Sequence, residues 1–294
     1  MILIGTDDGL LGLAEGGTRL LLDRPNVRAV DGDWAVAGDL VVALAGGQAV
    51  SLGGPTPLCV AALAEGSALV GTSGARLYRV SRAGEAEPVH GFDAIADRRD
   101  WYTPWGAPPD TRSVAIGQDG AWFVNVHVGG VWRSVDGGQS WWEVVAQERD
   151  THQVIAAGTR MLVAAAAGFG ASADGGDTWS WTVDGLHAPY ARAVAQAGDF
   201  ELVTASTGPG TDRAALYRRP AGSNAPFERC RTGVPEWFDH NVDTFQLAAR
   251  DDTVLLGTPG GTLHRSDDAG RSFATAVEGL PPIRWVGFHA SRAE

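Results

Sequence analysis

The chain contains no lysine, so all 23 of its basic residues are arginines. Acidic residues number 35, which gives a formal net charge of −12 at neutral pH. Non-specific nucleic-acid binding and docking on anionic lipid both require a basic surface, which this balance does not supply. We therefore expect neither a nucleic-acid partner nor a membrane partner. Any cationic site must use the planar, permanently charged guanidinium group.

Cysteine is also scarce, with Cys59 and Cys230 as the two representatives. Their wide spacing offers neither a disulfide framework nor a metal-binding motif. No run of 18 uninterrupted apolar residues occurs, so no membrane span is predicted. Residues 1–8 lack the basic and apolar regions of a signal peptide. Together these absences predict a cytoplasmic protein with two buried free thiols.

Glycine, in contrast, is abundant, and its 40 residues separate many short apolar runs. This composition is typical of strands joined by tight turns. One unit recurs along the chain, and each copy opens with a short apolar strand. The seven openings are residues 28–30, 58–60, 112–114, 152–154, 192–194, 245–247 and 284–286. Their spacings of 30, 54, 40, 40, 53 and 39 residues match four-stranded propeller blades of about 40–45 residues with two insertions.

The two ends of the chain hold complementary fragments of this unit. Residues 283–288 form an opening strand with no strands after it, and residues 2–5 form a second strand with no opening strand before it. Pairing between them would close the ring and protect the edge strands. The sequence therefore predicts an all-β fold, a single domain over residues 1–294. We expect a seven-bladed β-propeller of four-stranded antiparallel blades, closed by the C-terminal strand.

Three polar turns share the pattern Ser-x-Asp-x-Gly-x-Thr/Ser-aromatic. They span residues 134–141, 172–179 and 266–273. The pattern resembles the Asp-box, or BNR repeat, of sialidase-like and photosystem-assembly-factor-like propellers. In such a turn the Asp accepts backbone N–H bonds, and Gly takes a conformation that other residues avoid. The resemblance implies a propeller architecture over the whole chain and a structural role for the turns themselves.

The resemblance does not extend to sialidase chemistry. Sialidases carry an Arg-Ile-Pro type motif, whereas the nearest stretch here, residues 282–285, reads Pro-Ile-Arg-Trp. Their propellers have six blades, and seven are counted in this sequence. Tyr102 and Glu236 are weak matches for the nucleophilic pair of a sialidase. We therefore expect this chain to lack sialidase activity.

The opening strands of a propeller line its central channel, so their first residues should meet at one mouth. The aligned positions are Arg28, Leu58, Arg112, His152, Arg192, Phe245 and Arg284. Guanidinium groups this close repel one another unless an anion compensates them. The anion is either a ligand held by bidentate hydrogen bonds or a set of protein carboxylates. The carboxylates expected nearby are Asp7, Asp8, Asp110, Asp239 and Asp243.

Two long loops between blades, residues 91–111 and 231–243, should join the same face, and both are rich in aromatic residues. Exposed loops of this composition form lids and pocket walls. We expect substrate-binding contacts from the four aligned arginines and from an aromatic wall. The predicted wall residues are Trp101, Tyr102, Trp105, Tyr190 and Trp237.

His127 ends a second strand, and His152 opens the next blade, so both are expected at the mouth. With Asp239 they are the candidate catalytic acid–base groups. These imidazoles, together with His187, His240, Glu236 and Asp239, are also candidate ligands for a divalent transition metal. The alternative is that each His makes local hydrogen bonds. No motif for a nucleotide, flavin or other cofactor is present.

These features favour a small-molecule-binding propeller, and specifically a hydrolase or lyase acting on a small anionic substrate. The alternative is a non-enzymatic scaffold, in which the exposed aromatics anchor a protein partner and the arginines receive its acidic groups. Carbohydrate binding is a third interpretation, but it does not require four arginines. A deep pocket with inward-pointing histidines indicates an enzyme, and a broad shallow face indicates a scaffold.

Overall fold

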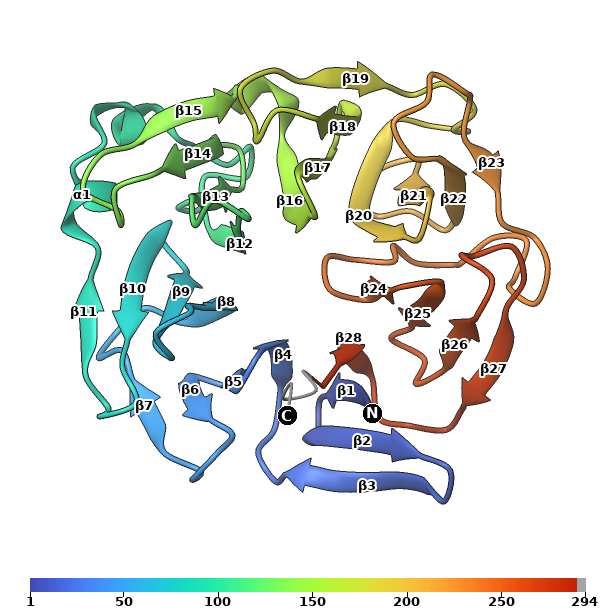
Figure 1. Ribbon diagram of the computed structural model, residues 1–294, viewed down its shortest axis with the longest axis horizontal. Coiled ribbons are helices and arrows are strands. Elements are labelled where there is room, and N and C mark those ends of the chain that lie inside the picture. The colour runs from blue at the N-terminus through green and yellow to red at the C-terminus, as the bar shows by residue number, and fades with distance from the viewer. Residues whose placement is uncertain (290–294) are drawn as a thin grey trace.

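The structure is a computed structural model that describes residues 1–289. These residues form seven four-stranded antiparallel sheets arranged as blades around a central axis (Figure 1). The predicted seven-bladed β-propeller is therefore confirmed. No helix within residues 1–289 has the length and apolar character needed to cross a lipid bilayer.

Six blades are continuous in sequence. The first two contain β4 (Val27–Asp31), β5 (Trp34–Ala37), β6 (Leu40–Ala43) and β7 (Ala49–Ser51), then β8 (Pro57–Ala62), β9 (Ala68–Thr72), β10 (Arg76–Val80) and β11 (Ala86–Pro88). The next two contain β12 (Thr111–Ile116), β13 (Trp122–Val126), β14 (Gly130–Ser134) and β15 (Trp142–Val145), then β16 (Thr151–Ala157), β17 (Arg160–Ala165), β18 (Gly168–Ser172) and β19 (Ser180–Thr182). The last two contain β20 (Tyr190–Ala197), β21 (Phe200–Ser206), β22 (Ala214–Pro220) and β23 (Glu228–Arg229), then β24 (Leu247–Arg250), β25 (Thr253–Gly257), β26 (Leu263–Ser266) and β27 (Ala274–Val277).

The seventh blade joins the two ends of the chain. It contains β28 (Ile283–Phe288), β1 (Ile2–Thr6), β2 (Leu10–Ala14) and β3 (Gly17–Leu22). Strand β28 lies antiparallel to β1, with Ile2 opposite Phe288 and Gly5 opposite Trp285. This pairing confirms the predicted closure of the ring.

Burial is highest in the middle of a blade and lowest at its outer edge. Every residue of the second strands β1, β9 and β13 is buried, because neighbouring blades cover both faces of these apolar runs. The outermost strands β3 and β27 are largely exposed. Blades pack closely enough that a Cβ added to Gly71 would lie 2.3 Å from Cγ2 of Thr111 in the next blade. The core therefore lies between blades.

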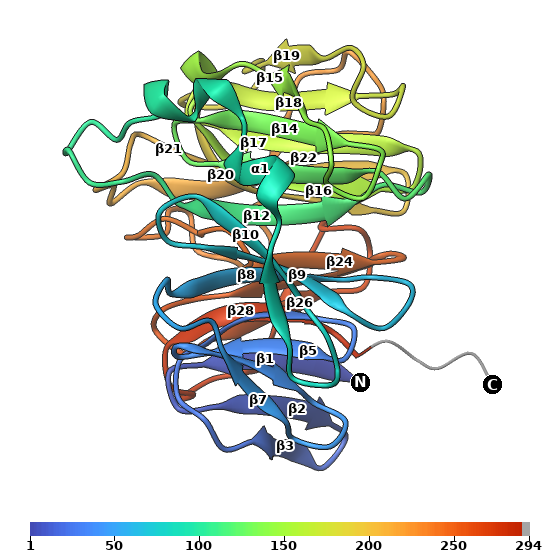
Figure 2. The same cartoon turned by 90° about the vertical axis from the view of Figure 1, so that its left-hand side faces the viewer.

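The short helical segments lie within the insertions. They are α1 (His90–Asp93), η1 (Ala96–Asp100) and η2 (Gln147–Arg149). Helix α1 lies on the outer side of the ring beside β10 (Figures 1 and 2). Its Phe92 is fully buried and packs against Trp101 and Trp141. The first long loop therefore covers part of the core.

The three repeated polar turns connect third and fourth strands, on the face opposite the starts of the first strands. In the turn at residues 172–179, Ser172 Oγ accepts the N–H of Gly176 at 2.8 Å. Asp174 accepts the backbone N–H of Thr178 at 2.9 Å and its hydroxyl at 2.6 Å. The indole N–H of Trp179 donates to the carbonyl of Gly176 at 3.1 Å. The turns at 134–141 and 266–273 repeat the Ser and Asp hydrogen bonds.

The Asp174→Asn variant tests how these turns stabilise the fold. The hydroxyl and then the N–H of Thr178 lower the pKa of Asp174 to about 2, whereas an unfolded Asp titrates near pH ~4. The charged side chain therefore stabilises the fold fully above about pH 4, and this contribution is lost as the pH falls towards 2. We expect a melting temperature ~2 °C lower at pH 7 and a difference that shrinks on acidification from pH 5 to pH 3.

Thermal unfolding followed by circular dichroism measures this effect. Asp184→Asn, at an exposed side chain in the following loop, is the matched control and should leave the melting temperature unchanged. Equal effects of the two substitutions would contradict the structural role of the turn.

Both cysteines are free and buried, as predicted. Burial raises the pKa of the Cys59 thiol and of the Cys230 thiol to about 12 in each case. Because the thiolate is the reactive form, we expect no reaction of the native protein with a disulfide reagent at pH 8. Two thiols per chain should react once denaturant is added. A fast-reacting thiol in the native protein would show that one site is accessible.

Candidate functional site

A cavity of about 550 Å³ lies at the mouth where the first strands begin. Its wall contains all four aligned arginines, and it also contains His127 and Trp105. A second cavity of about 720 Å³ lies at the opposite mouth, where the same strands end, and most of its lining residues are apolar. Phe245 borders both cavities. The aligned arginines and His127 therefore lie together at the mouth where the first strands begin.

A β-bulge positions nearly every aligned side chain at this mouth. In β12 the pairing with β13 passes from Thr111 to Ser113 and leaves Arg112 without a partner residue. The same shift occurs in five other first strands, and the residues it skips are Arg28, Leu58, His152, Arg192 and Arg284. A bulge bends its strand and re-aims a side chain. The seventh aligned residue, Phe245, precedes β24 and has a positive φ of 71°.

The four aligned arginines differ in how far nearby carboxylates balance their charges. Arg112 Nη2 and Arg192 Nη2 lie 3.2 and 2.7 Å from the two carboxylate oxygens of Asp243. Burial acts to raise the pKa of Asp243, but the two guanidiniums outweigh it and hold that pKa below its ordinary value. Arg284 makes a bidentate pair with Asp7, at 2.6 and 2.8 Å. The expected partners Asp7 and Asp243 are thus paired with aligned arginines.

Some guanidinium N–H groups around the cavity have no partner among the residues that the structure describes. Arg28 makes no ion pair with any residue of the described range 1–289. Nε of Arg192 is buried and has no hydrogen-bond partner in that range. A guanidinium has five N–H donors, and Arg112 and Arg192 share a single carboxylate. The mouth therefore has spare capacity to bind an acceptor-rich group.

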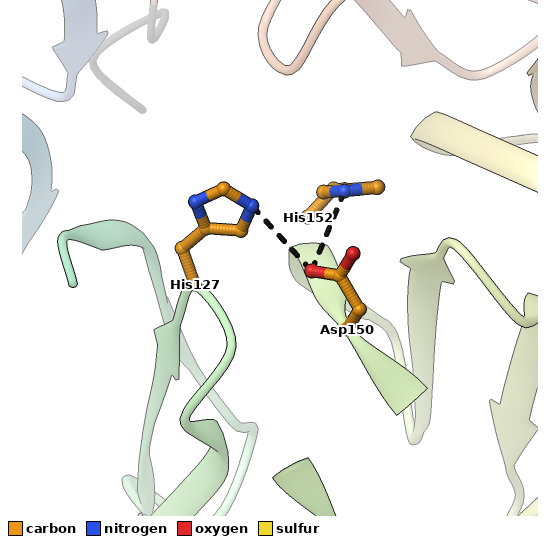
Figure 3. A group of neighbouring side chains, drawn as sticks. All are labelled: His127, Asp150 and His152. Atoms are coloured by element: carbon orange, nitrogen blue, oxygen red, sulfur yellow. Dashed lines mark ion pairs between the residues drawn. The ribbon is translucent and has the colours of Figure 1, made fainter. Parts of the chain in front are cut away.

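His127, Asp150 and His152 converge beside the arginines (Figure 3). Asp150 Oδ1 lies 3.4 Å from Nε2 of His127 and 3.7 Å from Nε2 of His152. The three ligand atoms all lie within 4.8 Å of one another, so these residues could hold a metal ion. Asp150 has a positive φ of 50°, a conformation that costs energy for a residue other than Gly.

Both histidines are neutral at pH 7. Burial, reinforced by the charges of Arg112 and Arg192, lowers the pKa of His127 to about 3. The same causes lower the pKa of His152 well below its ordinary value. His152 is fully buried, and its Nδ1 lies 2.6 Å from the carbonyl oxygen of Ala191. Nδ1 is therefore the donor to that carbonyl, and Nε2 presents a lone pair towards Asp150.

One residue of the expected aromatic wall, Trp105, lines the cavity. Trp105 borders the cavity, and its ring centroid lies 5.3 Å from that of His127. The ring of Tyr190 lies 4.8 Å from that of His152, and its hydroxyl accepts a bond from Arg192 at 3.2 Å. Tyr102 is 56% exposed and follows the core residue Trp101 in the same loop. Neither Tyr190 nor Tyr102 borders the cavity.

Two other expected wall residues lie away from the cavity. Trp101 is buried in the core, with its ring 5.8 Å from Phe92 and 5.7 Å from Trp132. Burial of its apolar surface there explains why it does not face the mouth. Trp237 packs against His187, and the guanidiniums of Arg213 and Arg229 lie over its ring. Neither tryptophan borders the cavity.

The expected acid–base and metal cluster is also assembled differently. The side chain of Asp239 is 91% exposed and lies 3.6 Å from His240, outside the cavity wall. His187 bonds to Tyr217 and to a backbone carbonyl. Glu236 pairs with Arg229 at 3.2 Å. The carboxylate that meets His127 and His152 is instead that of Asp150, which the sequence interpretation missed.

A signal for Asp150 exists in the sequence. Asp-Thr pairs immediately precede three of the aligned positions, at residues 110–111, 150–151 and 243–244. Asp110 and Asp243 border the cavity, and Asp150 contacts both histidines. Extending the alignment two residues back along each strand would have found all three. The mouth then holds four arginines and four carboxylates, so its formal charge is zero in a chain whose total is −12.

Comparison with known proteins shows the fold and no more. No family model matches the chain, and no curated protein matches it. The WD40 β-propeller domain of Doa1 is 14% identical with a TM-score of 0.64, over 99% of this chain and 89% of that one. The GH74 xyloglucanase of Xanthomonas campestris is 15% identical with a TM-score of 0.58, over 94% of this chain and 47% of that one. YCF48 bound to a D1 peptide is 15% identical with a TM-score of 0.51, over 74% of this chain and 65% of that one.

The chain thus spans under half of the xyloglucanase and under two thirds of YCF48. At identities this low, the three likenesses define the class of protein as a seven-bladed β-propeller. The neighbours include an enzyme and a WD40 domain, so the function must be argued from the site.

Asp243→Asn tests the electrostatics of the mouth. The change leaves Arg112 and Arg192 close together without their shared counter-charge. Removing one partner of a fully buried pair costs ~3–5 kcal/mol. The Asp243 side chain is 40% exposed, and water screens part of the loss, so we expect about 1–2 kcal/mol. Chemical denaturation measures the change, and sulfate should restore part of the lost stability.

Asp239→Asn is the control, because its side chain is exposed. It should unfold like the wild type with or without sulfate. An Asp243→Asn protein as stable as the wild type would show that the two arginines do not depend on this carboxylate.

Proposed function

We propose that the chain binds a small anionic molecule at the arginine-lined mouth and acts on it as an enzyme of hydrolase or lyase type. The observation that carries the proposal is the surplus of guanidinium donors around a cavity of about 550 Å³. Arg28 has no ionic partner among residues 1–289, and Arg112 and Arg192 share one carboxylate. A carboxylate, phosphate or sulfate group accepts several such bonds at once.

His127 is the proposed proton acceptor. It borders the cavity as a neutral imidazole, since burial and the two nearby guanidiniums lower its pKa to about 3. An anionic substrate held by those guanidiniums opposes their effect and raises the pKa towards the working range of a general base. Binding of the substrate thus activates the base.

Two reactions are compatible with this arrangement. In an elimination, His127 takes the proton from the carbon next to the substrate carboxylate, the C–H electron pair forms the double bond, and the leaving group departs from the neighbouring carbon. In a hydrolysis of a lactone or ester, His127 takes a proton from water while the water oxygen attacks the acyl, phosphorus or sulfur centre. The bond from that centre to the leaving alkoxide then breaks, and the alkoxide takes the proton back from the imidazolium. In both, the arginines hold the substrate anion, and Trp105 limits its position.

A scaffold function is the alternative, and the exposed aromatics of the first long loop favour it. Tyr102 and Trp105 are 56% and 65% exposed. Exposed aromatics beside arginines are suited to anchoring a protein segment with acidic groups. A scaffold needs no proton acceptor, so the role of His127 separates the two functions.

We further infer that the three repeated turns are Asp-box turns of the BNR type, since they share one pattern of Ser and Asp hydrogen bonds. Two free buried thiols support a reducing, cytoplasmic location. The charge of −12 argues against nucleic acid or anionic membrane as a partner. The proposed partner is therefore a small anionic ligand.

Binding and turnover are tested separately. We expect small carboxylates, phosphate or sulfate to raise the melting temperature of the wild type, and Arg28→Gln to weaken the best of these ligands about tenfold, or ~1.4 kcal/mol. Arg19→Gln, on the exposed outer strand β3, is the control. A screen of β-substituted carboxylates, lactones and phosphate or sulfate esters then identifies turnover.

His127→Gln should abolish turnover and retain binding of the anion. Anion binding by wild type and variant with no turnover of any compound would favour the scaffold. Unchanged affinity in Arg28→Gln and in an Arg112→Gln/Arg192→Gln double variant would refute the anion site itself.

A further inference from the structure

Two hydrogen-bond acceptors face each other beside the cavity with nothing donated between them. Nδ1 of His152 donates to the carbonyl of Ala191 at 2.6 Å, so Nε2 presents a lone pair. That Nε2 atom lies 3.7 Å from Oδ1 of Asp150. Both atoms are buried and lack a hydrogen-bond partner within the described chain. Buried polar atoms are normally satisfied, and two lone pairs in contact repel unless a positive charge lies between them.

A hydrogen-bonded triad does not account for the contacts. Nε2 of His127 lies 3.4 Å from Oδ1 of Asp150, which is longer than an ordinary N–H···O bond of about 2.7–3.2 Å. Oδ1 is without a hydrogen-bond partner although two imidazole nitrogens are close to it. The three atoms surround a common point rather than forming a chain of short bonds.

The spacing agrees with that of ligands around a tetrahedral metal ion. Nitrogen and oxygen ligands lie about 2.0–2.1 Å from zinc, so neighbouring ligand atoms in a tetrahedral site are about 3.3 Å apart. The observed separations are 3.4 and 3.7 Å, and all three atoms lie within 4.8 Å of one another. Small side-chain rotations would bring them onto one ion.

The surrounding structure orients the three groups as ligands. The carbonyl of Ala191 fixes the tautomer of His152, as outer hydrogen bonds commonly do for metal-binding histidines. Asp150 is held between η2 and β16 at a positive φ, and its carbonyl accepts the N–H of Ala166 at 2.9 Å. His127 follows β13, and its N–H donates to the carbonyl of Asp110 at 2.9 Å. Two segments, the end of β13 and the start of β16, thus present their donor atoms to one place (Figure 3).

We propose that His127, Asp150 and His152 form a binding site for one divalent transition metal ion of the zinc class. Two imidazoles and one carboxylate are the donors that such ions prefer. Three protein ligands leave a coordination position open, as in catalytic rather than structural zinc sites. His127 borders the arginine-lined cavity, so the site adjoins it.

Charge links the ion to the cavity. The charges of Arg112 and Arg192 are balanced by those of Asp243 and Asp150. A divalent ion therefore leaves this part of the mouth with an excess of two positive charges, which an anionic ligand can offset. Metal binding itself depends only on the three ligands. An ion bound to His127 would occupy the lone pair that the proposed base uses, so the metal-bound and the base-active site are alternative states, and each is tested on its own.

Cobalt(II) titration of tag-free, chelator-treated protein is the direct test. We expect one Co²⁺ per chain, with the intense visible absorption of a low-coordinate ion, and displacement of that ion by Zn²⁺. His127→Gln and Asp150→Asn should each weaken binding at least tenfold. His90→Gln, an exposed histidine in α1, should bind as the wild type does.

Circular dichroism establishes that each variant is folded, and His127→Gln, at the rim of the cavity, provides the test if Asp150→Asn unfolds. Absence of a stoichiometric cobalt complex, or equal affinity in the His127→Gln variant, would overturn the proposal. Imidazole ¹⁵N spectra give a second readout, because Zn²⁺ should shift Nε2 of both histidines. Protonated Nε2 atoms that do not respond to Zn²⁺ would show a hydrogen-bonded triad instead.

The two proposals fail separately. Anion binding is measured on metal-free protein, and metal binding is measured without added anion. Loss of the first with retention of the second removes the proposed function and leaves the metal site in place.

Discussion

The antiparallel pairing of β1 with β28 is the constraint on which the ring depends. Each blade covers the faces of its neighbours, so an open ring would expose two apolar blade faces and two unpaired strand edges. Closure also completes the mouth. The bidentate pair between Asp7 and Arg284 joins the two ends of the chain, and both arise from the closing blade or the loop beside it. The cavity is therefore complete only when β28 has paired with β1.

The architecture was predictable because its signals are local and periodic. Recurring strands and turns gave the seven blades, and complementary fragments at the ends gave the closure. The aligned first-strand positions indicated which side chains gather at one mouth, because one residue per blade repeats around the ring. The bulges that aim those side chains had no separate signal, since a bulge is a relation between two strands rather than a pattern within one.

Loop residues were less predictable for a physical reason. A tryptophan in a long loop either faces solvent or turns inward, and its large apolar surface favours burial whenever the core offers space. Trp101 is buried beside Phe92, whereas Trp105, four residues later, remains exposed. The positions of the His187 and Asp239 side chains likewise depend on local contacts, which follow no periodic pattern in the sequence. Asp150 could have been predicted from the sequence, because the Asp-Thr pair at the start of its blade recurs at the start of two other blades.

The bulged positions have one more consequence. A residue skipped by the ladder makes no contribution to strand register, so its side chain can be exchanged without shifting the pairing on either side. The mouth is thus assembled from six positions outside the ladder on a constant frame. Exchanging the side chains at these positions, together with the carboxylates that pair with them, would change the binding chemistry of the mouth without changing strand register. The same freedom offers a route by which single substitutions redirect such a ring from one ligand to another.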